Sequence, residues 1–244
     1  MPTLDHTPPT EQTMHAKTIG IAGVTVPGAV DCLSKMHRLC AGRFAAHHHP
    51  RFALDQPDFG VVHQAQDDDR WDKVADSIVG SLERLAGAGA ELAVIPANTV
   101  HLVVEDIRAR SPIPLISMLD VVADACAARG LKRVVILGTR WTMARHLYQA
   151  PLAARGIEEV IPDEAQQAVI QRAIFEELVP SGRASEATLA ALLQVVAAMK
   201  AQGCDGVALA CTELPLALND ANCGVPAIDT TLALAEAAIA QACA

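Results

Sequence analysis

Short apolar runs bounded by glycine or small polar residues recur along the chain. In the first half they are residues 17–23 (KTIGIAG), 89–97 (GAELAVIPA) and 113–117 (IPLIS). In the second half they are residues 132–138 (KRVVILG), 203–211 (GCDGVALAC) and 225–229 (VPAID). Continuous apolar runs of this length are typical of strands buried on both faces of a parallel sheet. The pattern therefore predicts six buried strands.

The six runs form an internal repeat. The three runs of the second half follow those of the first half in the same order, at offsets of 115, 114 and 112 residues. The second pair aligns without a gap. Three matches at nearly constant spacing predict that the chain consists of two structurally similar halves.

Helical patterns separate the predicted strands. Apolar spacing near 3.6 predicts helices over 71–88, 119–129, 185–202 and 230–242, with Asp69 capping the first and Ser185 the third. Strands that alternate with helices predict an α/β fold of two similar lobes, each a parallel sheet flanked by helices, related by a pseudo-two-fold axis. The predicted boundaries are a disordered tail over 1–16, an N-terminal lobe over 17–131 and a C-terminal lobe over 132–244. The final helix is expected to pack back on the first lobe.

The strand ends predict where a ligand binds. In open parallel sheets, ligands bind beyond the carboxyl ends of the strands. The segments at these ends are 23–25, 97–99, 138–139 and 211–213. The repeat places Ala97 opposite Cys211, so we expect the two residues to face each other across one cleft that holds a single α-carbon.

Cys211 is the strongest candidate for chemistry. It follows a buried run and precedes Thr212 and Glu213. A thiol at a strand end beside a helix N-terminus can have its pKa lowered from about 8.5 toward neutrality, and it can then act as acid, base or nucleophile. On this interpretation Cys211 is the most readily alkylated of the seven cysteines. The alternative is a buried structural cysteine.

Polar residues after the other strand ends are candidate substrate contacts. Asn98 and Thr99 can hold a carboxylate or cap a helix. Thr139 and Thr142 can bind oxygen atoms or cap the next helix. His101 is either a structural histidine or an acid.

Arg51 is a further candidate, because its guanidinium suits bidentate binding of a carboxylate. The alternative for Arg51 is a solvated surface residue. The neighbouring run of residues 47–49, three consecutive histidines, does not predict a metal site. Adjacent histidines in an extended strand cannot all face one ion, and no partner recurs at ligand spacing.

Composition narrows the possible partners. The chain has 244 residues and a net charge of −9, and only 3% of its residues are aromatic. An acidic surface repels nucleic acid, and scarce aromatics argue against stacking on single strands. No apolar run is long enough for a transmembrane helix, and the N-terminus lacks the pattern of a secretory signal. The sequence shows no nucleotide or dinucleotide motif, so no cofactor is implied. We expect a cytoplasmic protein that binds neither nucleic acid nor membrane.

Several motifs together carry a resemblance. They are residues 19–23 (IGIAG), 96–101 (PANTVH), 137–143 (LGTRWTM), 210–215 (ACTELP) and 228–231 (IDTT), with the segment from His48 to Phe59 as a binding arm. In this order they resemble the cofactor-independent aspartate/glutamate racemases. The resemblance implies two lobes that close over a small amino acid or dicarboxylate, and a cysteine from each lobe beside the α-carbon.

One residue departs from that pattern. The family's first cysteine corresponds here to Ala97, which carries no transferable proton. Three outcomes stay open: a racemase in which Cys211 is the surviving acid/base and another acid such as His101 or water replaces the thiol; a single-cysteine decarboxylase or isomerase; or an inactive amino-acid-binding protein.

The racemase hypothesis assigns the remaining roles. Its substrate is aspartate or glutamate, its oligomer a homodimer, and it needs no metal or cofactor. Arg51 is expected to bind the side-chain carboxylate, and Glu213 to take the ammonium group or orient the thiol. The predicted substrate-binding residues are Arg51, Gln56, Asn98, Thr99, Thr139, Thr142, Thr212 and Glu213.

Overall fold

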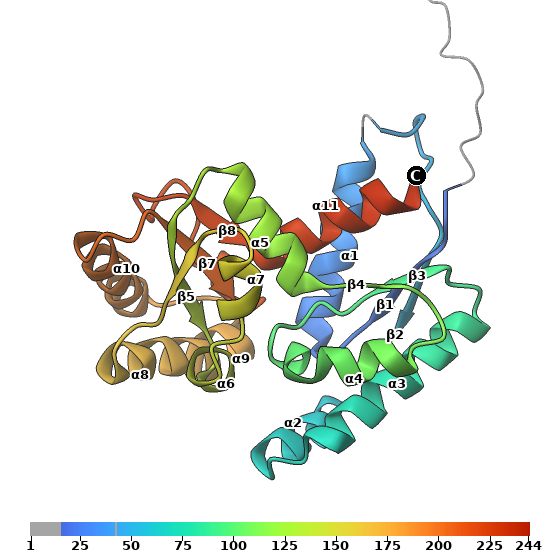
Figure 1. The fold of residues 1–244 in the computed structure, drawn as a ribbon, viewed down its shortest axis with the longest axis horizontal. Helices are drawn as coiled ribbons and strands as arrows, with labels where there is room; N and C mark the ends of the chain where they lie inside the picture. Colours follow the sequence, from blue (N-terminus) through green and yellow to red (C-terminus); the bar gives the residue numbers. More distant parts are fainter. Residues whose placement is uncertain (1–15, 42) are drawn as a thin grey trace, which may run out of the picture.

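Two four-stranded parallel sheets form the framework of the protein in a computed structural model, which describes residues 16–41 and 43–244. The strand order is β2-β1-β3-β4 in the first sheet and β6-β5-β7-β8 in the second, so the two sheets share one topology (Figure 1). The predicted tail over 1–16 lies, apart from Ala16, outside the described residues. The strands are β1 (Ile19–Ala22), β2 (Phe52–Asp55), β3 (Leu92–Val94), β4 (Leu115–Ile116), β5 (Arg133–Gly138), β6 (Glu158–Val160), β7 (Gly206–Ala210) and β8 (Ala227–Asp229).

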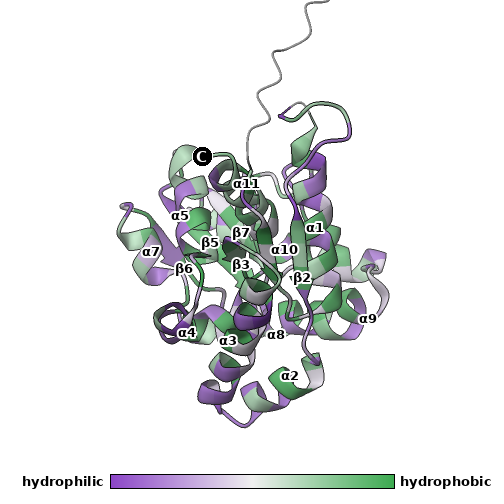
Figure 2. Ribbon diagram, turned by 90° about the vertical axis from the view of Figure 1, so that its right-hand side faces the viewer, coloured by the Kyte–Doolittle hydropathy of each residue, from purple (hydrophilic) through white to green (hydrophobic). Residues whose placement is uncertain are grey.

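The central strands are the most buried. Every residue of β1, β3 and β7 is buried, as the continuous apolar runs predict. Figure 2 shows the same arrangement, with hydrophobic colouring on β3, β5 and β7 at the centre of the molecule. The α/β fold of two similar parallel-sheet lobes is therefore confirmed.

Helices cover both faces of each sheet. In the first half they are α1 (Val26–Cys40), α2 (Phe59–Asp67), α3 (Trp71–Gly87), the 3-10 helix η1 (Thr99–Val103), α4 (Val104–Arg110) and α5 (Met118–Ala128). In the second half they are α6 (Arg140–Ala144), α7 (Gln149–Ala153), α8 (Glu164–Arg172), the π-helix η2 (Ala173–Leu178), α9 (Val179–Ser181), α10 (Glu186–Ala201), the 3-10 turn η3 (Leu214–Leu216) and α11 (Thr230–Ala242). Across the part of the chain that the structure describes, no helix has the length and apolar character needed to cross a membrane.

The four predicted helices form within one or two residues of their expected bounds, but one predicted cap is wrong. Ser185 caps α10 by accepting a hydrogen bond from the Thr188 backbone N–H at 3.2 Å. The predicted cap of α3, Asp69, is not its N-cap; that position belongs to Arg70, which makes no side-chain capping bond. Asp69 has a left-handed backbone (φ 55°), and its carboxylate instead pairs with Arg145 of the other half at 3.1 Å.

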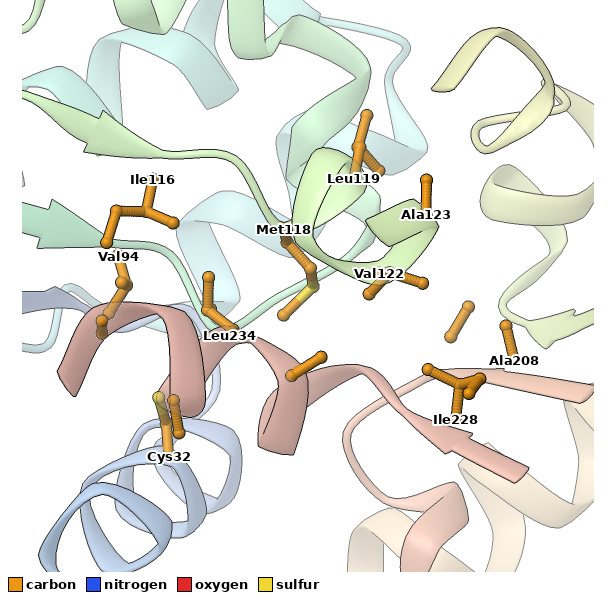
Figure 3. Close-up of a cluster of buried hydrophobic side chains, with 14 of the residues drawn as sticks. Cys32, Val94, Ile116, Met118, Leu119, Val122, Ala123, Ala208, Ile228 and Leu234 are labelled. Atoms are coloured by element: carbon orange, nitrogen blue, oxygen red, sulfur yellow. The ribbon is translucent and has the colours of Figure 1, made fainter. Parts of the chain in front are cut away.

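The last helix of each half packs on the other half. Helix α11 lies against α1, β3 and β4 of the first half, whereas α5 lies against α7 and β8 of the second (Figure 1). The side chains of α5 and α11 meet in one core that also contains Ile116 of β4 and Ile228 of β8 (Figure 3). The exchange of helices therefore joins the two sheets through a shared apolar core.

A buried ion pair joins α1 to the start of α11. The Lys35 ammonium lies 2.6 Å from the Asp31 carboxylate and 2.6 Å from that of Asp229. Asp229 also caps α11 by accepting from the Leu232 backbone N–H at 2.9 Å. Lys35 has a carboxylate partner on either side, which offsets the cost of burying its charge.

Candidate active site

The carboxyl ends of the two sheets meet around one cavity. Its lining includes Thr25 after β1, Ala97 after β3, Thr139 after β5 and Cys211 after β7. Strand ends from both sheets thus contribute to one site, in the place where ligands bind to parallel sheets. The structure places Ala97 and Cys211, the two positions that the repeat pairs, in the lining of this single cavity.

Close backbone packing positions the segment that holds Cys211. A Cβ atom on Gly138, at the end of β5, would lie 2.7 Å from the Ala210 carbonyl oxygen. No side chain fits in that space, so only glycine allows β5 and β7 to stay paired up to the residue before the thiol. The glycine that ends the predicted strand therefore has a direct role in the site.

Cys211 and Glu213 form a buried thiol–carboxylate pair. The Cys211 thiol donates to Glu213 Oε2 at 3.1 Å, and the Thr212 hydroxyl donates to the same oxygen at 2.7 Å. Burial, and then the negative charge of Glu213, raise the pKa of the Cys211 thiol well above its ordinary value. The thiol is therefore protonated in the ligand-free protein.

The predicted lowering of the Cys211 pKa is wrong for two structural reasons. The helix that follows is only the three-residue turn η3, which begins three residues further on. The predicted helix N-terminus is thus too short and too distant to stabilise a thiolate. In addition, Glu213 is a carboxylate placed in contact with the sulfur, and it opposes the negative charge.

This environment reverses the expected order of cysteine reactivity. Because thiolate is the reactive form and Cys211 is buried and protonated, we expect iodoacetamide to modify it more slowly than Cys243 at neutral pH. Cys243 is the one partly exposed cysteine of the seven, all of which lie in the described ranges. Mass-spectrometric mapping of a labelling time course measures both rates. Faster labelling of Cys211 in the ligand-free protein contradicts this assignment.

The second carboxylate oxygen of Glu213 is unsatisfied. Oε1 is buried and has no hydrogen-bond partner among the described residues, while the side chain as a whole is 4% exposed and lines the cavity. A buried carboxylate oxygen without a partner is costly. Glu213 is therefore ready to accept a hydrogen bond from a ligand in the cavity.

Three threonine hydroxyls meet where the two lobes face each other. Thr99 Oγ1 lies 3.0 Å from Thr139 Oγ1 and 3.5 Å from Thr142 Oγ1, and the two C-terminal-lobe hydroxyls are 3.2 Å apart. Thr99 and Thr139 line the cavity, whereas Thr142 is fully buried behind them. Each hydroxyl can rotate to donate to an anion, so this group suits a carboxylate that spans both lobes.

Asn98 is held by residues of the second half. The Tyr148 hydroxyl donates to Asn98 Oδ1, and Asn98 Nδ2 donates to Thr230 Oγ1 at 3.2 Å. The Thr230 hydroxyl in turn donates to the Leu209 carbonyl oxygen at 3.0 Å. These bonds fix the orientation of Asn98, which is 3% exposed, at the edge of the cavity.

His101, the candidate replacement acid, lies outside the cavity lining and has both ring nitrogens bonded to the backbone. Its Nδ1 bonds to the Ala97 carbonyl oxygen at 2.8 Å, and its Nε2 accepts from the Met118 backbone N–H at 3.3 Å. Both ring nitrogens are therefore occupied, and the side chain does not line the cavity. Burial lowers the pKa of His101 to about 4, so the ring is neutral at pH 7.

The burial of His101 predicts an acid-sensitive contribution to stability. Because its pKa is lower in the folded protein than the usual 6.5, its contribution is complete above pH 6.5 and is lost as the pH falls toward 4. The loss amounts to roughly 3 kcal/mol of unfolding free energy. Urea unfolding of wild type and His101→Asn at several pH values between 7 and 4 measures this loss. We expect the unfolding free energy of the variant to fall less steeply with decreasing pH than that of the wild type. His37→Asn at an exposed position is the matched control, and equal slopes for wild type and His101→Asn contradict the prediction.

Arg51 and Gln56 lie at opposite ends of β2. The Arg51 carbonyl accepts from the Ile19 backbone N–H at the start of β1, so Arg51 sits at the amino end of the sheet, away from the cavity. The structure therefore does not bring Arg51 to the site, and its side chain is exposed. Gln56 follows the carboxyl end, where its amide donates to the carbonyl oxygens of Val24 and Pro57. Gln56 thus supports the turn after β1 without lining the cavity.

Aromatic and aliphatic side chains form one wall of the cavity. They are Phe59 of α2, Trp141 of α6, Ile174 and Phe175 of η2, and Val179 of α9, with His63 of α2 among them. Sequence reasoning missed this wall as a site feature. Phe59 and Trp141 lie in the motifs quoted above, but η2 and α9 follow no predicted strand end, so only tertiary packing brings them to the cavity.

Comparisons with known proteins agree on one family. The profile of the Asp/Glu/Hydantoin racemase family matches residues 21–238. A broad specificity amino-acid racemase, RacX of Bacillus subtilis, is 25% identical over 168 residues, which cover 69% of this chain and 72% of RacX.

Two solved structures give a more detailed comparison. A Yersinia pestis protein assigned as an Asp/Glu racemase is 31% identical and superposes with a TM-score of 0.85, covering 93% of this chain and 99% of the other. A mutant of arylmalonate decarboxylase is 16% identical with a TM-score of 0.58, covering 92% of this chain and 93% of the other. The second likeness shows a shared fold alone.

Proposed function

Because the chain belongs to the Asp/Glu/hydantoin racemase family of isomerases, we propose that it transfers a proton at the α-carbon of an amino acid, with Cys211 as the acid/base. The observation that carries the proposal is the protonated Cys211 thiol on Glu213, in one cavity with Ala97. Ala97 occupies the position of the family's first cysteine, so one face of the α-carbon has no thiol. No cofactor takes part in this proposal.

The α-carboxylate is assigned to the polar residues at the lobe boundary. Thr99 and Thr139 offer hydroxyl donors from opposite lobes, and Asn98 keeps a second amide hydrogen beyond the one bonded to Thr230. A carboxylate held here gains donors from both sheets. The developing negative charge on an enediolate, formed when the α-proton leaves, is stabilised by the same donors.

The substrate ammonium is assigned to Glu213 Oε1, the buried oxygen without a partner. A positive charge at this place offsets the negative charge that raises the thiol pKa, so binding favours ionisation of Cys211. Glu213 Oε2 accepts the thiol proton, and the thiolate then removes the α-proton. The electron pair of the broken C–H bond stays on the substrate as the enediolate.

Return of the proton decides the product. Delivery by Cys211 restores the original configuration with exchange of the α-hydrogen. Delivery from the Ala97 side, by water, inverts the configuration. Because the Ala97 side has no thiol, we expect exchange with retention to be faster than inversion.

Incubation with L- and D-amino acids in deuterated water tests the proposal. The panel contains aspartate and glutamate, which the family resemblance suggests, together with leucine and phenylalanine. We expect deuterium at the α-carbon of at least one of them, measured by mass spectrometry, and slower inversion, measured by chiral chromatography. Absence of exchange with all four in a folded protein overturns the proposal.

Decarboxylation is a second candidate, favoured by the protonated resting state of the only thiol among the cavity-lining residues. In that reaction the C–C bond electrons stay on the α-carbon, CO₂ leaves, and the Cys211 thiol donates its proton to the carbanion. Release of CO₂ from a substituted malonate supports this candidate. Its absence, together with exchange of amino-acid α-hydrogens, favours the racemase.

The homodimer and the cytoplasmic location stay predictions. Light scattering after size-exclusion chromatography measures the oligomer directly. A monomer at micromolar concentration contradicts the prediction of a homodimer.

A further inference from the structure

Among its described lining residues, the cavity has one carboxylate, that of Glu213, but no lysine or arginine. Among the described residues that line it, the ionisable side chains are His63, Cys211 and Glu213, and none is a lysine or an arginine. On the assignment above, Glu213 binds the ammonium and the lobe-boundary hydroxyls bind the α-carboxylate. What remains for the substrate side chain is the wall formed by α2, α6, η2 and α9.

That wall is apolar and is built by both lobes. The centre of the His63 ring lies 5.4 Å from the ring centre of Phe59, 6.1 Å from that of Trp141 and 6.3 Å from that of Phe175. All three pairs are T-shaped, edge to face. Ile174 and Val179 complete the wall with aliphatic carbon. Such a surface gains free energy by covering apolar carbon and offers no strong donor to a carboxylate.

The ionisable side chains beside the wall already have partners. His63 Nδ1 lies 3.3 Å from Asp67, and the Arg140 guanidinium donates to the same carboxylate at 2.8 Å. Arg140 stacks over the Trp141 ring at 4.4 Å, and its side chain is 58% exposed outside the cavity. A substrate carboxylate on the wall would therefore lose water without gaining an unengaged arginine or lysine as partner, which disfavours its binding.

We propose that the site takes a neutral amino acid with a branched aliphatic or aromatic side chain, and that the wall formed by α2, α6, η2 and α9 binds that side chain. The inference rests on the proposed function, because it uses the positions assigned there to the ammonium and the α-carboxylate. It replaces aspartate and glutamate by leucine- or phenylalanine-like molecules as the preferred class.

Exchange and binding measured together separate this inference from the proposed function. We expect kcat/KM for α-deuterium exchange to be at least about 10-fold higher for leucine or phenylalanine than for aspartate or glutamate. We also expect titration calorimetry to show tighter binding of leucine or phenylalanine than of aspartate or glutamate. Preference for the acidic pair in either measurement overturns the inference while exchange itself still supports the proposed function. Binding of the neutral pair without any exchange supports the inference and contradicts the proposed function. Absence of both binding and exchange with the neutral pair overturns the inference.

Two variants test the wall itself. Phe175→Ala is expected to lower kcat/KM for phenylalanine at least about 10-fold relative to alanine as substrate, whereas Val61→Ala, at an exposed position of α2, is the matched control. A purely structural effect lowers kcat/KM equally for phenylalanine and alanine, and that result contradicts a role of Phe175 in binding the side chain. Val179→Arg places a guanidinium on the wall. We expect it to raise kcat/KM for glutamate relative to that for leucine at least about 10-fold. An unchanged ratio in folded Val179→Arg overturns the inference, even if Phe175→Ala fails to fold.

Discussion

Cys211→Ala is expected to lower the rate of α-hydrogen exchange by about 10²–10⁴-fold, the usual contribution of a positioned acid or base. Among the described residues that line the cavity, Cys211 carries the only sulfur, so no second thiol there can replace it. Loss of the sulfur also leaves Glu213 Oε2 with only the Thr212 donor. The measurement is the initial rate of deuterium incorporation, with the best substrate of the panel, at equal concentrations of folded protein.

Cys243→Ala is the matched control, because Cys243 is a thiol of the same chain that lies outside the cavity. It is expected to keep the exchange rate of the wild type. Circular dichroism and thermal unfolding confirm that both variants are folded. A Cys211→Ala variant that exchanges at the wild-type rate rules out the thiol as the acid/base.

Ala97→Cys is expected to create or raise two-base racemisation, by about 10²–10⁴-fold in the rate of inversion. The turn after β3 already presents this position to the cavity, and the substitution adds a single sulfur atom. The new thiol then supplies a proton on the face opposite Cys211, so inversion becomes comparable with exchange. Chiral chromatography over time measures the gain.

Two further variants make the Ala97→Cys result specific. Ala97→Ser adds a hydroxyl of similar size that is a much weaker acid than a thiol, and it is expected to give little or no gain. Cys211→Ala in the Ala97→Cys background is expected to remove the gain. A folded Ala97→Cys variant that binds substrate and does not invert it faster argues against paired half-sites and favours the one-sided decarboxylation chemistry.

The central strands were predictable because each consists of consecutive apolar residues, a pattern that depends only on neighbours in the chain. The edge strands were harder. Neither β2 nor β6 is among the six predicted strands, since both are short and partly exposed and so lack a continuous apolar run. The wrong cap at Asp69 has a similar origin, because its partner Arg145 comes from the other half of the chain.

The sequence by itself determined the two parallel sheets, the strand ends that carry Ala97 and Cys211, and the helix cap at Ser185. These features follow from periodicity, from the repeat and from hydrogen bonds between residues a few positions apart. Only the tertiary structure decided the protonation of Cys211, the neutral state of His101, the distance of Arg51 from the cavity and the apolar wall. A pKa depends on the burial and charge of every neighbour in space, and a cavity wall depends on which helices pack together. Neither the pKa nor the cavity wall can therefore be derived from residues that are adjacent in the chain.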